Sequence, residues 1–430
     1  MRIVIIGATG FIGGHIARRL AADGHDILPV ARDAAALARQ YPGRSVAVRD
    51  LGRAVEDDWY EVLVGADAVV NTVGIIRERG GDTHRAVHAE GPARLFRAAV
   101  AAAVPRLIHV SAIGADPESS SVYLRTKGQA EVFLDTLASA HPGLTVTILR
   151  PSLVYGPGGG STALFAALAA LPVVALPDGG GQSLQPVHVD DLAAAVAALV
   201  ATPLPWPRRL DVVGPQPITY AGMLAAYGRW LGRRRIPMLA MPGFAMAMVT
   251  WLGERFTDAP VTRDTWRMLR AGNTGDAAPL TRLLGLPPLD LDHGLARHPA
   301  TAADRRQARL YPLVRPLRWS SAFLWVFSGL ASLGLYPVAD SLDLLATVGI
   351  VGPFALPLLE ATAALDVLVG LLLLDRRRVV VVGALSIGLI VAYTAILSIA
   401  APEFWLHPFG PIAKNVPLVA ATLAVMAWEA

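Results

Sequence analysis

The sequence contains no cysteine among its 430 residues. Disulfide bonds, thiol catalysis and cysteine-ligated metal sites are therefore excluded. Charged residues are also scarce, at 17%, whereas an average soluble domain has about 25%. Hydrophobic residues make up 53% of the chain. This balance indicates that part of the protein lies in lipid.

Features of nucleic-acid-binding proteins are missing as well. The net charge is +4, but there is no basic stripe interleaved with aromatic residues and no zinc-finger or RNA-recognition motif. We therefore expect no nucleic acid partner. The basic excess lies in short arginine clusters beside apolar segments, where a membrane explains it. Because no signal peptide precedes the first apolar run, we expect the N-terminus to stay in the cytoplasm.

The first half of the chain alternates short apolar runs with helical stretches such as residues 15–22 and 89–103. Fully apolar strands that alternate with helices predict a parallel sheet covered on both faces. The expected fold is a Rossmann-like, doubly wound α/β domain over residues 1–157, whose ligand binds at the carboxyl ends of the strands. The predicted strands are 3–6, 26–30, 45–48, 68–72, 107–110 and 144–149.

Glycine-rich turns loosen the pattern from about residue 158. We expect residues 158–297 to form a smaller lobe that closes over a substrate. Two apolar stretches in it, residues 162–177 and 238–252, are short or interrupted by proline. We interpret both as core helices or the lining of a groove rather than membrane spans.

The last quarter predicts a transmembrane helical bundle, residues 319–430, behind a basic linker, residues 298–318. A helix needs about 20 apolar residues to span the hydrocarbon, and four segments fit. The alternative is a buried bundle in a soluble protein. Arginines in the linker and at Arg376, Arg377 and Arg378 place the first domain and the C-terminus on the cytoplasmic side. The predicted spans are 319–336, 350–374, 379–400 and 411–428.

A glycine motif follows the first predicted strand and opens the first helix, at residues 7–13. Gly7 permits a tight turn, Gly10 lets the backbone approach a pyrophosphate, and Gly13 lets helix and strand pack closely. The helix N-terminus then offers free N–H groups to phosphate. The alternative is a glycine-rich turn without a ligand.

Residues at the ends of the next two strands bear on the cofactor. An acidic residue after the second strand holds the ribose 2′-hydroxyl of NAD, whereas an arginine suits the 2′-phosphate of NADP. The chain has Arg32 followed by Asp33, so NADP(H) is favoured over NAD(H). Asp50 is placed to accept a hydrogen bond from the adenine amino group, or is simply an exposed loop acid.

Tyr123 and Lys127 are spaced to share one face of a helix, and Ser111 ends the preceding strand. A free phenol, with a pKa of about 10, is a poor base at neutral pH. A neighbouring ammonium lowers that pKa. Tyr123 would then exchange a proton with a substrate oxygen that Ser111 holds, while a nicotinamide exchanges hydride.

With these residues, the chain resembles the atypical or extended short-chain dehydrogenases/reductases over about residues 1–295. The stretch from His109 to Lys127 is similar to bacterial relatives of the Rossmann-fold accessory subunit of respiratory complex I. The tail resembles DoxX-like membrane domains, notably at residues 408–415. The resemblance implies cofactor contacts from Gly7, Thr9, Gly10, Phe11, Ile12, Gly13, Arg32, Asp50, Leu51, Thr72, Val73, Gly74, Tyr123, Lys127 and Pro151.

One position departs from that family. Where its reductases often carry an asparagine in a proton relay, this chain has His88, which would either relay a proton or serve a structural role. Two functions stay open: an oxidoreductase acting on a small or lipid-like carbonyl or alcohol near the membrane, and a non-catalytic nucleotide-binding assembly or sensing subunit. Glu360 and Asp366, in a predicted span, are functional candidates facing the bundle interior. His84, His109 and His188 show no metal-ligand spacing, and no metal is expected.

Overall fold

The computed structural model describes residues 1–78, 80–202, 206–256, 262–408 and 410–429. It divides into two compact units, Met1–Ala308 and Arg309–Ala430. Most of the predicted linker is helical, because α13 (Ala302–Leu330) runs through it and contains Pro312 and Pro316. Phe409, in the DoxX-like motif, lies outside the described residues.

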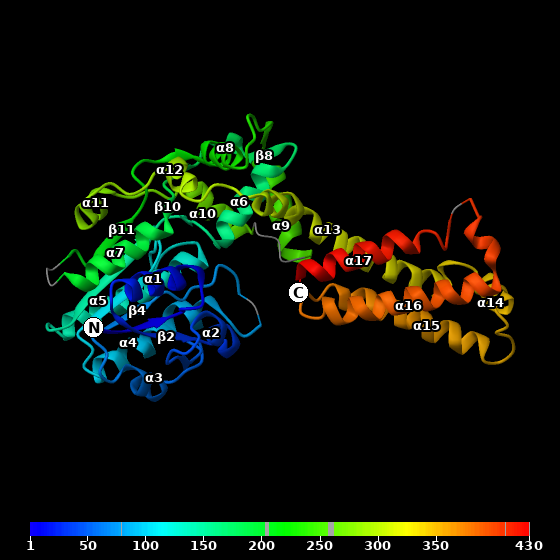
Figure 1. Ribbon diagram of the computed structural model, residues 1–430, viewed down its shortest axis with the longest axis horizontal. Helices are drawn as coiled ribbons and strands as arrows, with labels where there is room; N and C mark the ends of the chain where they lie inside the picture. Colours follow the sequence, from blue (N-terminus) through cyan, green and yellow to red (C-terminus); the bar gives the residue numbers. More distant parts are fainter. Residues whose placement is uncertain (79, 203–205, 257–261, 409, 430) are drawn as a thin grey trace. The chain divides into compact units, whose positions relative to one another are not determined.

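A seven-stranded parallel sheet is the centre of the first unit (Figure 1), in the order β11-β6-β5-β4-β1-β2-β3. The predicted doubly wound sheet is confirmed. Its order reverses between β1 and β4, and ligands of such sheets bind outside the carboxyl ends of the strands at that point. The strands are β1 (Arg2–Ile6), β2 (Asp26–Ala31), β3 (Ala47–Val48), β4 (Ala68–Asn71), β5 (Arg106–Val110), β6 (Thr145–Pro151) and β11 (Arg209–Val212).

Helices cover both faces of this sheet. Ile16 and Leu20 of α1 pack with α7 and α11 against one face, and Leu95 and Phe96 of α4 pack with α3 and α5 against the other. A π-helical turn, η1, leads into α4. These elements are α1 (Phe11–Ala22), α2 (Ala34–Gln40), α3 (Glu56–Leu63), η1 (Arg85–Glu90), α4 (Gly91–Ala101), α5 (Val122–Ala140), α7 (Val189–Ala201) and α11 (Ala278–Leu284).

The smaller lobe has its own apolar core, in which Tyr155, Met223 and Tyr227 are fully buried. Three two-stranded pairs, β7–β10, β8–β13 and β9–β12, brace it. Its strands are β7 (Val154–Tyr155), β8 (Val174–Pro177), β9 (Ser183–Leu184), β10 (Val187–His188), β12 (Ile218–Thr219) and β13 (Met238–Met241), and its helical elements are α6 (Gly160–Ala170), η2 (Asp178–Gly180), α8 (Tyr220–Trp230), α9 (Gly243–Phe256), α10 (Arg263–Ala271) and α12 (Leu291–Ala296).

The prediction for residues 238–252 is wrong in part. This stretch forms β13 and most of α9, and Met246 and Thr250 are buried as expected of core residues. Phe244, Met248 and Trp251, however, are exposed by 78%, 58% and 47% of their surface. Apolar composition alone could not show that these three side chains of the helix are exposed.

The second unit is helical. Two of its helices, α15 and α16, are long and apolar enough to cross a membrane, and a pair bent by 108° between residues 335 and 338 would make a third span. α17 has 15 residues, so the predicted count of four spans stays a prediction. The helical elements are η3 (Ala331–Leu335), α14 (Val338–Thr347), α15 (Ala355–Leu373), α16 (Val379–Ala400), η4 (Pro402–Trp405) and α17 (Asn415–Glu429).

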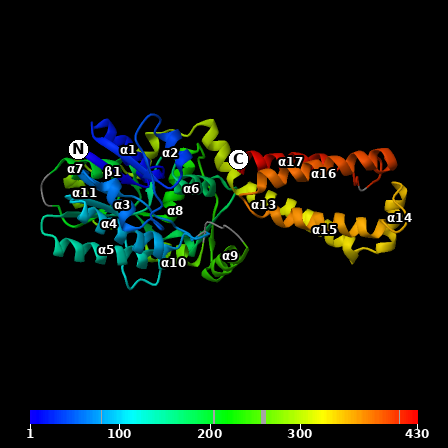
Figure 2. The ribbon, with the colours of Figure 1, turned by 90° about the horizontal axis from the view of Figure 1, so that it is seen from below.

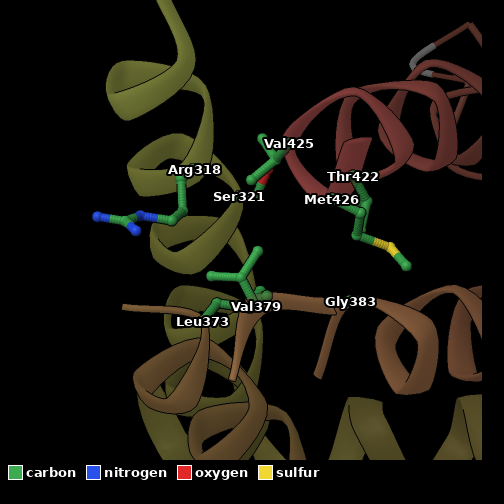
Figure 3. A pocket seen from close by; sticks show the side chains of 8 residues that line it. All are labelled: Arg318, Ser321, Leu373, Val379, Gly383, Thr422, Val425 and Met426. Carbon is green, nitrogen blue, oxygen red and sulfur yellow. The ribbon is translucent and has the colours of Figure 1, made fainter. Parts of the chain in front are cut away.

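Within this unit α16 packs against both α15 and α17 (Figure 2). A small cavity lies between residues of α13, α15, α16 and α17, among them Ser321, Gly383 and Thr422 (Figure 3). Arg318 also lines it, but its guanidinium group points away from Met426. Asp366 is buried inside the unit, whereas Glu360 is exposed. The expectation that both acids face the interior is therefore wrong for Glu360, which lies on another side of α15.

Candidate active site

In the glycine turn between β1 and α1, backbone atoms lie so close together that side chains would not fit. Gly7 has φ +84°, which favours glycine. A Cβ on Gly13 would lie 2.2 Å from the carbonyl oxygen of Gly7, and one on Gly10 would lie 3.2 Å from the same oxygen. The turn therefore presents bare backbone at the carboxyl end of β1.

The first turn of α1 leaves its N–H groups available. Gly10 is the N-cap and provides no side-chain acceptor, and the first turn holds no acidic residue. The amides of Phe11 and Ile12 come too early in the helix to have intrahelical partners. Such a helix start suits a phosphate group, so the turn fits the pyrophosphate of a dinucleotide.

At the end of β2, the two residues with opposite charges have different partners. Asp33 caps α2, because its Oδ1 accepts a hydrogen bond of 2.9 Å from the amide of Ala36. Arg32 is largely exposed and pairs with Asp82, which lies in the segment between β4 and η1. Asp33, the acid that made the choice between NADP(H) and NAD(H) less clear, is thus engaged as a helix cap.

The predicted adenine-side residues lie on the loop after β3. Asp50 Oδ1 accepts a 3.0 Å hydrogen bond from the amide of Gly52. Leu51 is buried at 3% exposure, and its carbonyl oxygen lies so close to Gly91 that a Cβ there would be 2.3 Å away. The loop is held against the start of α4.

The segment after β4 lies beside the glycine turn. Thr72 Oγ1 donates to the carbonyl oxygen of Ile6 at 2.8 Å, which ties this segment to β1. The amide of Val73 donates to Asn71 Oδ1 at 3.1 Å. A Cβ on Gly74 would lie 3.4 Å from Lys127 Nζ, so Gly74 brings this segment up to the amine.

Tyr123 and Lys127 lie one turn apart on α5, as predicted. Lys127 is 2% exposed, and its amine donates to the carbonyl oxygens of Val110 at 2.9 Å and Val73 at 3.4 Å. The ring of Tyr123 lies edge-on to those of His88, 5.2 Å between centroids, and His84, 6.1 Å. Its hydroxyl group forms no hydrogen bond within the part of the chain that the structure describes.

Burial opposes the predicted lowering of the tyrosine pKa. Burial raises the pKa of Tyr123 to about 12. Burial also lowers the pKa of Lys127 to about 8, although Glu131 opposes that shift. The phenol is consequently neutral at physiological pH and carries a proton that it can donate.

His88 uses both ring nitrogens within the protein. Nε2 accepts a hydrogen bond of 2.9 Å from the amide of Ile75, so the proton lies on Nδ1, which faces Thr126 Oγ1 at 3.2 Å. The ring is fully buried, and burial lowers the pKa of His88 far below its ordinary value. This arrangement favours the structural alternative, because a relay needs a nitrogen that is free to exchange a proton.

Ser111 is engaged by a residue that the sequence analysis missed. Its hydroxyl donates to Glu131 Oε1 at 2.6 Å, so the proton that would hold a substrate oxygen is directed into the protein. Glu131 is 1% exposed and also pairs with Arg150 and Arg209. The spacing places Glu131 one helical turn after Lys127 on α5, but the contact with Ser111 depends on how β5 and α5 pack and could not be identified from that spacing.

Two further features border the site. Pro151, at the end of β6, accepts a hydrogen bond of 3.0 Å from the amide of Ile113. Ser121, the N-cap of α5, donates to Asp264 of α10 at 2.9 Å, which fixes that helix of the smaller lobe next to Tyr123. Asp264 lies more than a hundred residues after Ser121 in the sequence, so no local pattern could predict this contact.

A possible cation-binding group was also missed. Ligand atoms of His188, Asp190 and His298 lie within 4.8 Å of one another. His188 Nδ1 already accepts a hydrogen bond from the amide of Asp190, and Arg297 lies 3.9 Å from the Asp190 carboxylate. The arginine competes with a cation there. Pattern spacing failed here because His298 lies more than a hundred residues after His188 and Asp190.

Comparisons with known proteins agree with this geometry. Residues 3–207 match the NAD-dependent epimerase/dehydratase family, and residues 322–423 match the DoxX-like family. Ceramide reductase of Caulobacter vibrioides is 31% identical over 250 residues, covering 57% of this chain and 75% of that protein. The mitochondrial NADH-ubiquinone oxidoreductase 40 kDa subunit of Neurospora crassa is 28% identical and covers 54% and 60%.

The structure of UDP-glucuronic acid 4-epimerase from Bacillus cereus, in complex with UDP-glucuronic acid and NAD, superposes with a TM-score of 0.53. Its sequence is 16% identical, and the match covers 72% of this chain and 100% of that one. This likeness shows the fold. The predicted resemblance to extended dehydrogenases and to DoxX-like domains is confirmed by these matches. The chain therefore belongs to the NAD-dependent epimerase/dehydratase family, as an NAD(P)-dependent oxidoreductase that continues into a DoxX-like membrane domain.

Proposed function

We propose that the protein is an NADP(H)-dependent reductase of a carbonyl group on a lipid-like molecule at the cytoplasmic side of a membrane. The observation that carries the proposal is the state of Tyr123. Its neutral phenol has no hydrogen-bond partner within the described residues and lies one helical turn from the buried amine of Lys127. A proton donor with no internal acceptor is what carbonyl reduction needs.

When bound, the nicotinamide would supply a hydride to the carbonyl carbon. Tyr123 donates its phenolic proton to the carbonyl oxygen, so that the product is an alcohol and the tyrosine is left as a phenolate. The positive charge of Lys127 favours that phenolate. His88 and Thr126 hold the helix of Tyr123 against the segment after β4, and Ser111 and Glu131 hold the end of β5.

Support for NADP(H) comes from the tip of β2. Asp33 is used as a helix cap, and Arg32 is exposed beside the turn. A guanidinium group pairs well with the two additional charges of a 2′-phosphate. Removing it with Arg32→Ala should weaken NADPH binding by about tenfold and leave NADH binding unchanged. Arg19→Ala is the control, because Arg19 pairs with Asp23 within α1.

A lipid-like substrate is supported by two comparisons: a relative named ceramide reductase, and the DoxX-like domain in the same chain. The proposed orientation rests on the charges beside the apolar helices. Arg376, Arg377 and Arg378 lie between α15 and α16. Arginines are enriched in the cytoplasmic loops of membrane proteins. Both the first unit and the C-terminus are then cytoplasmic.

The second candidate is a nucleotide-binding assembly or sensing subunit without turnover. One observation favours it: the Ser111 hydroxyl is bonded to Glu131 and offers no proton to a substrate. The relative from Neurospora crassa is also named as a subunit of a larger enzyme.

The two candidates separate in one experiment. The full-length protein, in detergent, is compared with Tyr123→Phe for NADPH binding and for NADPH oxidation with a panel of long-chain and short-chain carbonyl compounds. We expect Tyr123→Phe to bind NADPH normally and to lose about a hundredfold or more in rate. Tyr60→Phe, on the exposed side of α3, is the matched control. Equal rates in Tyr123→Phe and the native protein would exclude the proposed chemistry, and bound NADPH without turnover would favour the second candidate.

A further inference from the structure

The smaller lobe carries an exposed apolar surface that the proposed chemistry does not use. It consists of Leu239 on β13 and Phe244, Met248 and Trp251 on α9, which we call the α9 surface. Leu239 is exposed by 66% of its surface, and Phe244 by 78%. Scattered exposed apolar residues are ordinary, but large ones gathered together mark an interaction site.

The three helix residues lie on one side of α9. Successive residues of a helix are turned by about 100°, so positions 244, 248 and 251 fall within an arc of about 60°. Ala247, on the same side, is also exposed. Met246 and Thr250 point the other way and are 5% and 0% exposed. Among the side chains of the helix that the structure describes, those on one side are thus buried and those on the other are exposed.

The adjoining strands continue this surface. β8 and β13 pair in parallel, with Leu239 opposite Ala175, and both residues are exposed. Their neighbours Val174 and Leu176 are buried in the core of the lobe. Side chains alternate along a strand, so in β8 Val174 and Leu176 serve the core and Ala175 is exposed, whereas in β13 both Leu239 and Ala240 are exposed.

Positive charge borders this surface. Arg234 and Arg235 precede β13 and are exposed, and neither has an ion-pair partner in the described ranges. Arg233, in contrast, is used for the fold, since it donates to the carbonyl oxygens of Ala169 and Leu171. Asp178, which lies next to the start of α9, is 3.9 Å from Arg270, so its charge is balanced, and Arg234 and Arg235 add positive charge among the described residues.

We propose that the α9 surface lies in the interface of an anionic lipid bilayer, with Phe244, Met248 and Trp251 among the upper acyl chains and Arg234 and Arg235 at the phosphates. A helix with aromatic and apolar residues on one side and cations at its edge is typical of interfacial binding. Tryptophan favours this depth of a membrane. A bilayer is also the partner at hand, because the same chain carries a DoxX-like membrane domain.

The absence of cysteine makes a direct test possible. Single variants Phe244→Cys and Leu286→Cys of the full-length protein are labelled with a bimane fluorophore and placed in nanodiscs of equal parts phosphatidylcholine and phosphatidylglycerol. Leu286 is the matched control: it is exposed by 59%, and it follows α11, which lies at the opposite end of the first unit from α9 in Figures 1 and 2.

We expect lipids brominated in their acyl chains to quench the label at position 244 at least about twofold more than the label at 286, and aqueous iodide to show the reverse order. Free quenching of position 244 by iodide, with no effect of brominated lipid, would overturn the proposal. So would protection from both quenchers, which would indicate a protein partner or a second copy of the chain.

The role of the arginines has its own arm. Arg234→Gln with Arg235→Gln, in the Phe244→Cys background, should reduce quenching by brominated lipid in the anionic nanodiscs and have little effect in pure phosphatidylcholine. An equal loss in both lipids would reject the charge contribution. Neither readout depends on turnover, so the result stands apart from the fate of the proposed reductase activity.

Discussion

Each of the two units contains a buried acid, and the two acids differ in the partners that surround them. Glu131, against the sheet, is 1% exposed and is held by Arg150, Arg209 and Ser111. Asp366, in the helical unit, is 9% exposed, and its only hydrogen bond within the described residues is a long one of 3.5 Å from the Tyr393 hydroxyl. Both are buried carboxyl groups on helices, but only the first has compensating charges.

This difference indicates what each acid is for. A buried charge is costly unless it is paired and hydrogen-bonded. In the first unit, the ion pairs and the hydrogen bond of Glu131 offset that cost. They also join α5 to β5, β6 and β11 beside the candidate site. Among the described residues of the helical unit no cation pairs with Asp366, and an unpaired acid in a predicted span is a candidate functional residue.

The largest effect is expected from Glu131→Gln. The amide keeps the size of the side chain but leaves Arg150 without its partner and Arg209 with Asp135 alone, at a cost of about 3 kcal/mol. We take the low end of the range because Arg150 and Arg209 are 24% and 37% exposed. The unfolding temperature of the full-length protein should fall by about 5–10 °C.

Glu118→Gln, an exposed acid on the loop before α5, is the control and should leave that temperature unchanged. An unfolding temperature equal to that of the native protein in both variants would mean that the charges around Glu131 contribute nothing.

The next largest loss of stability is expected from a change in the helix packing of the second unit. A Cβ on Gly370 would lie 2.6 Å from Val326 Cγ2 and 2.8 Å from the carbonyl oxygen of Ala322. Gly370→Val should therefore cost about 1–3 kcal/mol by forcing α13 and α15 apart. Gly388→Val, where a Cβ meets nothing within 4 Å, carries the same change in helix propensity without the collision. Thermal unfolding in detergent that is alike for the two variants would contradict the close contact of α13 and α15.

Local sequence predicted the parts of the molecule that depend on neighbouring residues. The glycine turn, the alternating strands and the apolar helices each lie in a short segment, and each was found. Glu131 was missed as the partner of Ser111 because its importance depends on Arg150 and Arg209, which arrive from β6 and β11. The bare side of α9 was missed for the same reason, since exposure depends on what the rest of the chain fails to cover.

The pH profile of carbonyl reduction tests the buried charge of Lys127, whose compensation lies between that of Glu131 and that of Asp366. Lys127 is compensated only in part by Glu131, and burial lowers its pKa to about 8. A lysine is charged below its pKa, so the reduction rate should be level between about pH 6 and 7 and should fall as pH rises through 8, by about tenfold for each further unit. Lys127→Arg should keep its charge at those pH values and flatten the decline. A native profile that stays level to about pH 9.5 would show that the charge of Lys127 is not needed.

The smallest change in stability is expected from Asp366→Asn. The amide can still accept a hydrogen bond from Tyr393, and no cation loses a partner, so the free energy of unfolding should stay within about 1 kcal/mol of the native value. Glu360→Gln, on the exposed side of the same helix, is the matched control. A loss as large as that of Glu131→Gln would mean that Asp366 is a structural charge whose compensation lies outside the single chain. Unchanged stability together with slower reduction of a membrane-embedded carbonyl would instead assign Asp366 a functional role.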